Sequence, residues 1–243
     1  MQTAVVAGGG GDIGAAISKA LAARELRVAV LDIDPTAAEQ VAADLPSGYG
    51  QSFECDLTSP PSVAAAMSAV RADLGEVAVV VSNVGWTPNK PFSETSWEEQ
   101  KQIIEINYGG PLNIVREVLD DLRTASSGRL IFVSSDAARV GTPKEAVYAG
   151  AKAGLIAFAK SLAIEVAREG VTVNVVSPGT TRTSRLESML TAEQIDRRVR
   201  ANPMRRLAEP GDVAGAVGYF AGPEAAYLTG QVLSVNGGMS RVD

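Results

Sequence analysis

The chain has 243 residues, of which 46% are hydrophobic, so it can bury the core of one large domain or of two small ones. Its net charge of −6 argues against general nucleic-acid binding, and its single cysteine, Cys55, excludes an intramolecular disulfide and fits a reducing cytoplasm. Histidine is absent, which excludes Ser-His-Asp and Cys-His mechanisms and histidine-ligated metal sites, so we expect no metal.

Short apolar runs alternate along the chain with longer amphipathic ones. The apolar runs predict strands at 3–7, 27–32, 51–54, 77–82, 130–134, 171–176 and 232–235. The amphipathic runs between them predict helices at 13–24, 35–45 and 60–74, a long helix from a capping box at 96–99 towards residue 126, and a helix at 147–168 that is ended by Gly170. Strands rich in Val, Ile and Leu that alternate with helices predict an α/β fold, a Rossmann-like doubly wound parallel sheet with helices on both faces. No linker or repeat interrupts this order, so we expect a single domain over residues 1–243.

No apolar run approaches the roughly 18 residues that span a bilayer, and no signal-peptide pattern opens the chain, so we expect a cytoplasmic protein.

A glycine-rich stretch, AGGGGDIG at 7–14, lies between the first strand and the first helix. A doubly wound fold binds the pyrophosphate of a dinucleotide at this position, although a merely flexible turn has the same composition. Gly8, Gly11 and Gly14 are the glycines expected beside the phosphates, and Asp12 stands where a G-x-x-x-G-x-G frame has its middle glycine. Because Asp12 precedes Ile13, we expect its carboxylate to cap the helix and to point away from the phosphates.

An acid at the end of the second strand indicates which dinucleotide is bound. Asp32 can accept hydrogen bonds from the adenosine ribose hydroxyls and would repel a 2′-phosphate, so with Ile33 after it the sequence favours NAD over NADP. A solvated strand-end carboxylate is the alternative. Asp56, after the third strand, could reach the adenine amino group or could cap the turn Asp56-Leu57-Thr58.

Tyr148 and Lys152 lie four residues apart in a predicted helix, so their side chains share a face. An ammonium beside a phenol favours the phenolate and lowers the pKa of tyrosine from about 10, which provides an acid/base group without histidine, although a surface pair has the same spacing. Ser134 and Ser135 follow a buried strand at its carboxyl end, where ligands of open α/β sheets bind. Asn107 lies within a long predicted helix, an unfavourable position unless its side chain has a partner.

These residues resemble the short-chain dehydrogenase/reductase family over nearly the whole chain. The matching motifs are the 7–14 turn, Ser82-Asn83-Val84-Gly85, Asn107 in its helix, Ser135, the Tyr148 and Lys152 pair, and the segment 178–183 (PGTTRT). The resemblance implies that Tyr148 exchanges a proton with the substrate while hydride passes to or from NAD. It also implies that Lys152 lowers the Tyr148 pKa and binds the nicotinamide ribose, that Ser135 holds the substrate oxygen, and that Asn107 holds a water. With the turn residues above, the expected cofactor contacts are Gly8, Gly11, Asp12, Ile13, Gly14, Asp32, Ile33, Asp56, Leu57, Asn83, Val84, Gly85, Tyr148, Lys152, Pro178, Gly179, Thr181 and Thr183.

The segment 182–206, here called the covering segment, follows the Pro-Gly turn and is expected to lie over the substrate, within a substrate-covering region at about 180–210. It carries seven arginines and three acids, a net charge of +4 (7 − 3) in an acidic protein. A basic cover indicates an anionic substrate, such as a carboxylate or a CoA thioester, with Arg182 and Arg185 as contacts. A solvated helix face or a subunit contact is the alternative.

A narrower resemblance, to the 2-hydroxycyclohexanecarboxyl-CoA dehydrogenases, rests on the stretches 83–86, 134–141, 145–149 and 172–176. It implies a cyclic 3-hydroxyacyl-CoA substrate, with Trp86 against the ring and Arg139 facing an acidic group or a partner subunit, although Trp86 could equally be an ordinary buried residue. Two alternatives stay open: a 3-oxoacyl-carrier-protein reductase, which Asp32 disfavours because that role usually uses NADPH, and a catalytically silent dinucleotide-binding regulator. The family commonly forms tetramers, so we expect a homotetramer that acts on a small molecule, with neither nucleic acid nor membrane as a partner.

Overall fold

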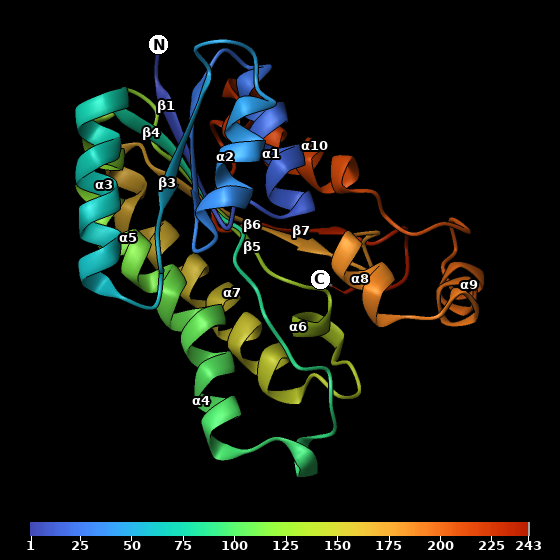
Figure 1. Cartoon of the computed structure of the whole chain (residues 1–243). Coiled ribbons are helices and arrows are strands. Elements are labelled where there is room, and N and C mark those ends of the chain that lie inside the picture. Colours follow the sequence, from blue (N-terminus) through green and yellow to red (C-terminus); the bar gives the residue numbers. More distant parts are fainter. Residues whose placement is uncertain (243) are drawn as a thin grey trace.

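The computed structural model describes residues 1–242, in which seven strands form one parallel sheet (Figure 1). Their order across the sheet is β3-β2-β1-β4-β5-β6-β7, and each neighbouring pair is parallel. The winding therefore reverses between β1 and β4, and ligands of doubly wound sheets bind at the carboxyl ends of the strands beside such a reversal. The strands are β1 (Thr3–Ala7), β2 (Arg27–Asp32), β3 (Gly50–Glu54), β4 (Val77–Ser82), β5 (Arg129–Val133), β6 (Thr172–Pro178) and β7 (Val232–Val235).

Helices cover both faces of this sheet, because successive residues of a strand point to opposite sides. One layer contains α3 (Pro60–Leu74), α5 (Gly110–Thr124) and α7 (Ala146–Val166), and the other contains α1 (Asp12–Ala22), α2 (Pro35–Ala43) and α10 (Pro210–Ala221) (Figure 1). In β1, Val5 and Ala7 pack into the first core, whereas Ala4 and Val6 pack into the second. The Rossmann-like, doubly wound α/β fold expected from the sequence is thereby confirmed.

The long helix expected after Ser96 is present but is not a uniform α-helix. Its capping box forms as predicted, and α4 spans Trp97–Ile104 before a π-helical turn at Glu105–Gly109 leads into α5. Asn107 is fully buried in this turn, and its side-chain amide donates to the Ile103 carbonyl oxygen at 2.7 Å. Single π-helical turns inside helices are frequent at functional sites.

Three short helices that the sequence pattern did not predict lie outside the two layers. They are α6 (Ala137–Val140), α8 (Ser184–Met189) and α9 (Ala192–Ala201). Figure 1 shows α8 and α9 together to one side of the helical layers, so the covering segment projects from the sheet instead of packing on it. Three-residue 3₁₀ turns occur at Phe92–Glu94, Ala167–Glu169 and Pro223–Ala225.

One helical stretch, Ala146–Glu169, is long and apolar enough by composition to cross a membrane, contrary to our expectation that no segment would be. Leu155, Leu162 and Val166 of this stretch enter the core beneath the sheet, and 33% of the apolar window is buried. Buried core helices pass the same compositional test as membrane spans, so this helix is weak evidence for a membrane.

Candidate active site

The glycine-rich turn between β1 and α1 is held close to the β4 strand end. Gly8 has a φ of 74°, and a Cβ there would lie 3.0 Å from the Val84 nitrogen, so a side chain would be both strained and crowded. The Asn83 side-chain amide donates to the Gly8 carbonyl oxygen at 2.9 Å. Gly14 is equally crowded, because its Cβ would meet the backbone of Gly8 and Gly9. The turn and the β4 end therefore form one rigid unit across the winding reversal.

The start of α1 fits an anion. Gly11 is the N-cap residue and offers no side-chain cap, so within residues 1–242 no side chain is bonded to the first-turn N–H groups in the way that caps other helices. A Cβ on Gly11 would meet nothing within 4 Å, so the turn opens on free space there. Uncapped N–H groups and the positive end of an eleven-residue helix attract phosphate. Gly11 and Ile13 are thus placed where the pyrophosphate of a dinucleotide would fit, whereas Gly14 is buried against Gly8 and Gly9.

Asp12 does not cap α1, so that expectation was wrong. It is the first helical residue, and its carboxylate accepts two hydrogen bonds from Ser184 at the start of α8, at 2.8 Å from the backbone nitrogen and at 3.2 Å from the hydroxyl. The carboxylate thus points away from its own helix turn, towards the covering segment. Ser184 was not identified from the sequence, and its separation of 172 residues from Asp12 left no local signal.

Asp32 lies where a ribose-binding carboxylate is expected, at the carboxyl end of β2. Its two oxygens accept hydrogen bonds from the backbone nitrogens of Gly10, at 2.9 Å, and Asp34, at 3.1 Å. The carboxylate therefore braces the glycine-rich turn and also places a negative charge beside it. Because each carboxylate oxygen has a further lone pair, ribose hydroxyls could still bind. Ile33 is 66% exposed and open to a ligand.

The other expected adenine contacts have structural roles. Asp56 accepts hydrogen bonds from the Thr58 nitrogen at 2.9 Å and from its hydroxyl at 2.7 Å, as in the turn-capping alternative. Leu57 is buried in the core, and its carbonyl oxygen accepts from the Asn113 side chain.

Tyr148 and Ser135 meet at the carboxyl end of β5, beside α7. The pKa of the Tyr148 hydroxyl is raised to about 12, chiefly by burial and in smaller part by the charge of Glu145, while the nearby Ser135 hydroxyl and the charge of Arg185 act in the opposite direction. The expected lowering of this pKa by Lys152 is therefore not observed, because Lys152 is not among the groups that shift it. Tyr148 is protonated at neutral pH. Glu145 was missed from the sequence, although its spacing of three residues within one helical turn could have indicated it.

Lys152 is buried and directed at the backbone. Its ammonium donates to the carbonyl oxygens of Val84 at 2.7 Å and Val133 at 2.9 Å. These carbonyls favour the charged form, but burial opposes it and lowers the pKa of Lys152 to about 7. Lys152 thereby ties α7 to the ends of β4 and β5.

Asn107 holds the segment that follows β4. Its side-chain oxygen accepts from the Trp86 nitrogen at 3.1 Å, and its amide donates to the Trp86 carbonyl oxygen at 2.7 Å. A Cβ on Gly85 would lie 3.5 Å from the Asn107 oxygen and 3.7 Å from the Lys152 ammonium nitrogen, so Gly85 lies between these two side chains. Trp86 is half-buried and belongs to neither core, so it is not the ordinary core tryptophan considered as an alternative.

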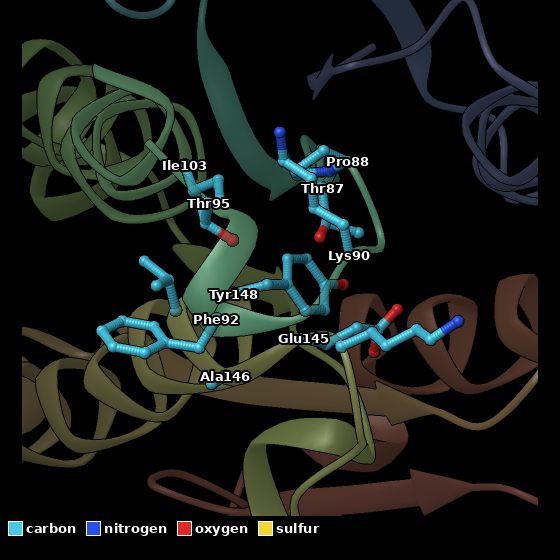
Figure 2. Close-up of a pocket in the computed structure, with 11 residues that line it drawn as sticks. Thr87, Pro88, Lys90, Phe92, Thr95, Ile103, Glu145, Ala146 and Tyr148 are labelled. Atoms are coloured by element: carbon cyan, nitrogen blue, oxygen red, sulfur yellow. The ribbon is translucent and has the colours of Figure 1, made fainter. Parts of the chain in front are cut away.

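A hollow opens in front of Tyr148 (Figure 2). The Tyr148 ring lies between Thr87, Pro88 and Lys90 of the segment after β4 and Glu145 at the start of α7. Its remaining lining is Phe92, Thr95, Ile103, Lys144, Ala146 and Val147. The accessible volume of the hollow is about 10 Å³, roughly the space of one water molecule.

The Pro-Gly turn closes the site from the β6 side. Pro178 ends β6, and a Cβ on Gly179 would lie 3.0 Å from Asn236, so a side chain there would be tightly packed. Thr181 donates its hydroxyl to the Gly179 carbonyl oxygen, and the Thr183 hydroxyl caps α8 by accepting from the Leu186 nitrogen. Both threonines therefore shape the turn from which the covering segment starts.

Two of the four expected substrate contacts are occupied elsewhere. Arg182 pairs with Glu187 at 2.9 Å and with Glu209 at 3.2 Å, so its charge is neutralised within the chain. Arg139 donates to the Ser234 hydroxyl and to the Val242 carbonyl oxygen, so it holds the C-terminal stretch and not the hollow.

Four of the seven arginines of the covering segment, Arg182 included, are paired with acids. Arg197, Arg200 and Arg206 pair with Glu193, Asp196 and Asp212. Arg185, Arg198 and Arg205 make no ion pair within residues 1–242, and of these Arg185 donates to the Thr87 carbonyl oxygen at 3.0 Å. Its charge also acts on the Tyr148 hydroxyl. Arg185 is therefore the arginine of this segment best placed for a substrate anion.

Comparison with known proteins gives a consistent result over the full length. A family model described as enoyl-(acyl carrier protein) reductase matches residues 9–240. The 3-oxoacyl-(acyl-carrier-protein) reductase of Escherichia coli K12 is 36% identical over 241 residues, covering 99% of this chain and 98% of that protein. The enzyme of the same name from Vibrio cholerae is 37% identical over 238 residues, covering 98% and 97%. Nodulation protein G of Rhizobium meliloti is 34% identical over 241 residues, covering 99% and 98%.

Proposed function

The chain belongs to the short-chain dehydrogenase/reductase family, and we propose that it interconverts the 3-oxo and 3-hydroxy groups of an acyl thioester. The names of the similar proteins support the carrier-protein reductase, which was the alternative in the sequence analysis, over the cyclic hydroxyacyl-CoA dehydrogenase. The observation that carries the proposal is the placement of Tyr148, which lines a hollow at the carboxyl edge of the sheet with its hydroxyl near Ser135.

We propose NAD(H) as the cofactor. The start of α1 would hold the pyrophosphate, Asp32 the adenosine ribose, and the turn at Pro178 and Gly179 the nicotinamide end. Support comes from the Asp32 carboxylate beside the Gly10 nitrogen, because a 2′-phosphate at that position would meet a negative charge. The bound dinucleotide supplies or accepts the hydride.

In the reductive direction, Tyr148 acts as the proton donor. Hydride adds to the C3 carbonyl carbon, and the proton of the Tyr148 hydroxyl moves to the oxygen, giving the 3-hydroxy product and a phenolate that recovers its proton from solvent. Ser135 holds the same oxygen by a hydrogen bond. Because the Tyr148 pKa is about 12, the hydroxyl carries its proton at neutral pH and suits reduction. Lys152 and Asn107 hold the chain at the ends of β4 and β5 in place beside Tyr148.

Arg185 would meet the anionic part of the substrate. It is exposed, lies at the edge of the site against Thr87, and opposes the charge of Glu145 near the Tyr148 hydroxyl. A thioester of CoA or of a carrier protein carries phosphate beyond the acyl chain, and guanidinium binds phosphate well. The expected homotetramer and cytoplasmic location stay predictions; a monomer mass by light scattering would contradict the first.

The test is oxidation of NADH or NADPH with a 3-oxoacyl-CoA, a carrier-protein 3-oxoacyl thioester, the free 3-oxo acid and a neutral ketone. We expect the thioesters to react and the Tyr148→Phe variant to lose at least about 100-fold in kcat, a typical loss for a proton-transfer group, while it still binds NADH. Tyr227→Phe, a change at a fully exposed residue, is the matched control. Turnover of Tyr148→Phe near that of the control would contradict the assignment of Tyr148, and activity on neutral ketones alone would contradict the thioester.

A further inference from the structure

The contact between Asp12 and Ser184 joins two parts of the molecule that the proposed chemistry needs to act together. Asp12 belongs to the phosphate-binding turn, and Ser184 is the first residue of α8 in the covering segment. Both hydrogen-bond donors of Ser184, the backbone N–H and the hydroxyl, go to the Asp12 carboxylate, at 2.8 and 3.2 Å. The covering segment is thus attached directly to the start of α1.

Further contacts hold the same end of the covering segment, among them a backbone hydrogen bond from the Arg182 nitrogen to the Ala208 carbonyl oxygen at 2.8 Å. Arg185 donates to the Thr87 carbonyl oxygen after β4, and Arg182 pairs with Glu209 just before α10. The contact with Asp12 is the one that reaches the glycine-rich turn. Beyond α8, the ion pairs of Arg197 and Arg200 lie within α9, and its end is held by Asn202, whose side-chain amide donates to the Asn236 carbonyl oxygen at 2.9 Å.

A carboxylate at this position needs an explanation, because it stands beside uncapped N–H groups that suit a phosphate. An acid facing the same groups would repel the pyrophosphate. Here the carboxylate is turned to Ser184, and hydrogen bonds to both of its oxygens hold it in that orientation. The same orientation of the Asp12 carboxylate therefore directs its negative charge away from the phosphate site and attaches the covering segment.

We propose that Asp12 is a positioning residue, which closes the covering segment over the glycine-rich turn and thereby slows release of the bound dinucleotide. Closure is a property of the protein alone. The effect on release rests on the proposed function, since it requires a dinucleotide at the start of α1.

Trypsin measures closure without any ligand, because the covering segment contains seven arginines. Asp12→Ala removes the acceptor, and Ser184→Pro removes both donors while it keeps α8, since Thr183 is the N-cap and proline is favoured at the first helical position. Glu39→Ala, an exposed acid on α2, is the control. Equal melting temperatures would show that the variants fold.

We expect both variants to be cleaved within residues 182–206 about 5- to 10-fold faster than the wild type and the control, because hydrogen bonds to a carboxylate are lost at an exposed site. The double variant should be no faster than either single one. Unchanged cleavage in both variants would overturn the proposal.

Stopped-flow fluorescence of bound NADH then tests the effect on release. We expect a dissociation rate several-fold higher in Ser184→Pro, which keeps the carboxylate but frees it to face the phosphates. A dissociation rate equal to that of the wild type would overturn the role in cofactor retention, even with faster cleavage. Failure of the wild-type protein to bind NADH or NADPH is a different result, because it refutes the proposed function and leaves the cleavage experiment intact.

Discussion

Replacing Lys152 by methionine should change how stability depends on pH. Lys152 is 2% exposed, and its pKa in the folded protein is lowered by burial from 10.5 to about 7. That difference corresponds to roughly 5 kcal/mol against the charged form. Methionine has a similar length and no charge, so Lys152→Met removes this cost. It also leaves the Val84 and Val133 carbonyls without their donor, but that loss does not depend on pH.

The sign follows from proton binding. Below pH 7 the lysine is charged in both the folded and the unfolded states, and folding bears the whole cost of burying the charge. As the pH rises from 7 towards 10.5, the folded lysine is neutral while the unfolded one still binds a proton, so the cost falls away. Between about pH 6 and pH 9, the free energy of unfolding of the wild type should therefore rise by roughly 2 to 3 kcal/mol relative to that of Lys152→Met.

Urea unfolding followed by circular dichroism, at several pH values across this range, measures the difference. Lys160→Met is the matched control, because Lys160 lies on the same helix and is exposed. The control should follow the wild type at every pH. If the wild-type and Lys152→Met curves run parallel, the lysine keeps an ordinary pKa in the folded state, and the argument from burial is wrong.

Two further predictions concern binding. Asp32→Ser should raise the ratio of kcat/KM for NADPH over NADH by at least about 10-fold, because it removes the negative charge that a 2′-phosphate would meet; an unchanged ratio in initial-rate assays would show that Asp32 only braces the turn. Arg185→Gln should raise the KM for a 3-oxoacyl-CoA by about 10-fold, because a charged hydrogen bond to an anion is lost, and should leave the KM for a neutral ketone unchanged. Arg200 is already paired with Asp196, so Arg200→Gln is the control and should change neither KM.

The sheet could be predicted closely from the sequence, because its strands are short apolar runs bounded by turn residues. The predicted strands at 27–32 and 77–82 and the helix at 60–74 agree with β2, β4 and α3 in both bounds. The helix after Ser96 was placed correctly by its capping box, but its π-helical turn could not be predicted, because it depends on the Asn107 side chain reaching Trp86 and the Ile103 carbonyl. Helices α8 and α9 carry no buried residues, so the apolar periodicity that reveals a core helix is missing from them.

In the site, likewise, the features set by local spacing could be predicted and those set by burial could not. Tyr148, Ser135 and Lys152 could be found because spacing along a helix and position at a strand end fix where such side chains go. The pKa values of Tyr148 and Lys152 could not be predicted, because burial shifts them more than the neighbouring charge that the four-residue spacing suggested.

Net charge was a poor guide to the covering segment because it ignores which charges are paired. The pairs of Arg197 with Glu193 and of Arg200 with Asp196 have the four-residue helical spacing, and their acids are already counted in the net charge of +4. The pair of Arg182 with Glu209 spans 27 residues, and the contact of Asp12 with Ser184 spans 172, so neither could be predicted from the sequence. Once the paired arginines are removed, Arg185, Arg198 and Arg205 remain, and the argument for an anionic substrate depends on Arg185, which lies beside Thr87 and acts on the Tyr148 hydroxyl. An overall charge of +4 would have attracted any anion, whereas a single arginine at the edge of the hollow restricts recognition to an anion that is attached to the reacting carbonyl by a chain of suitable length.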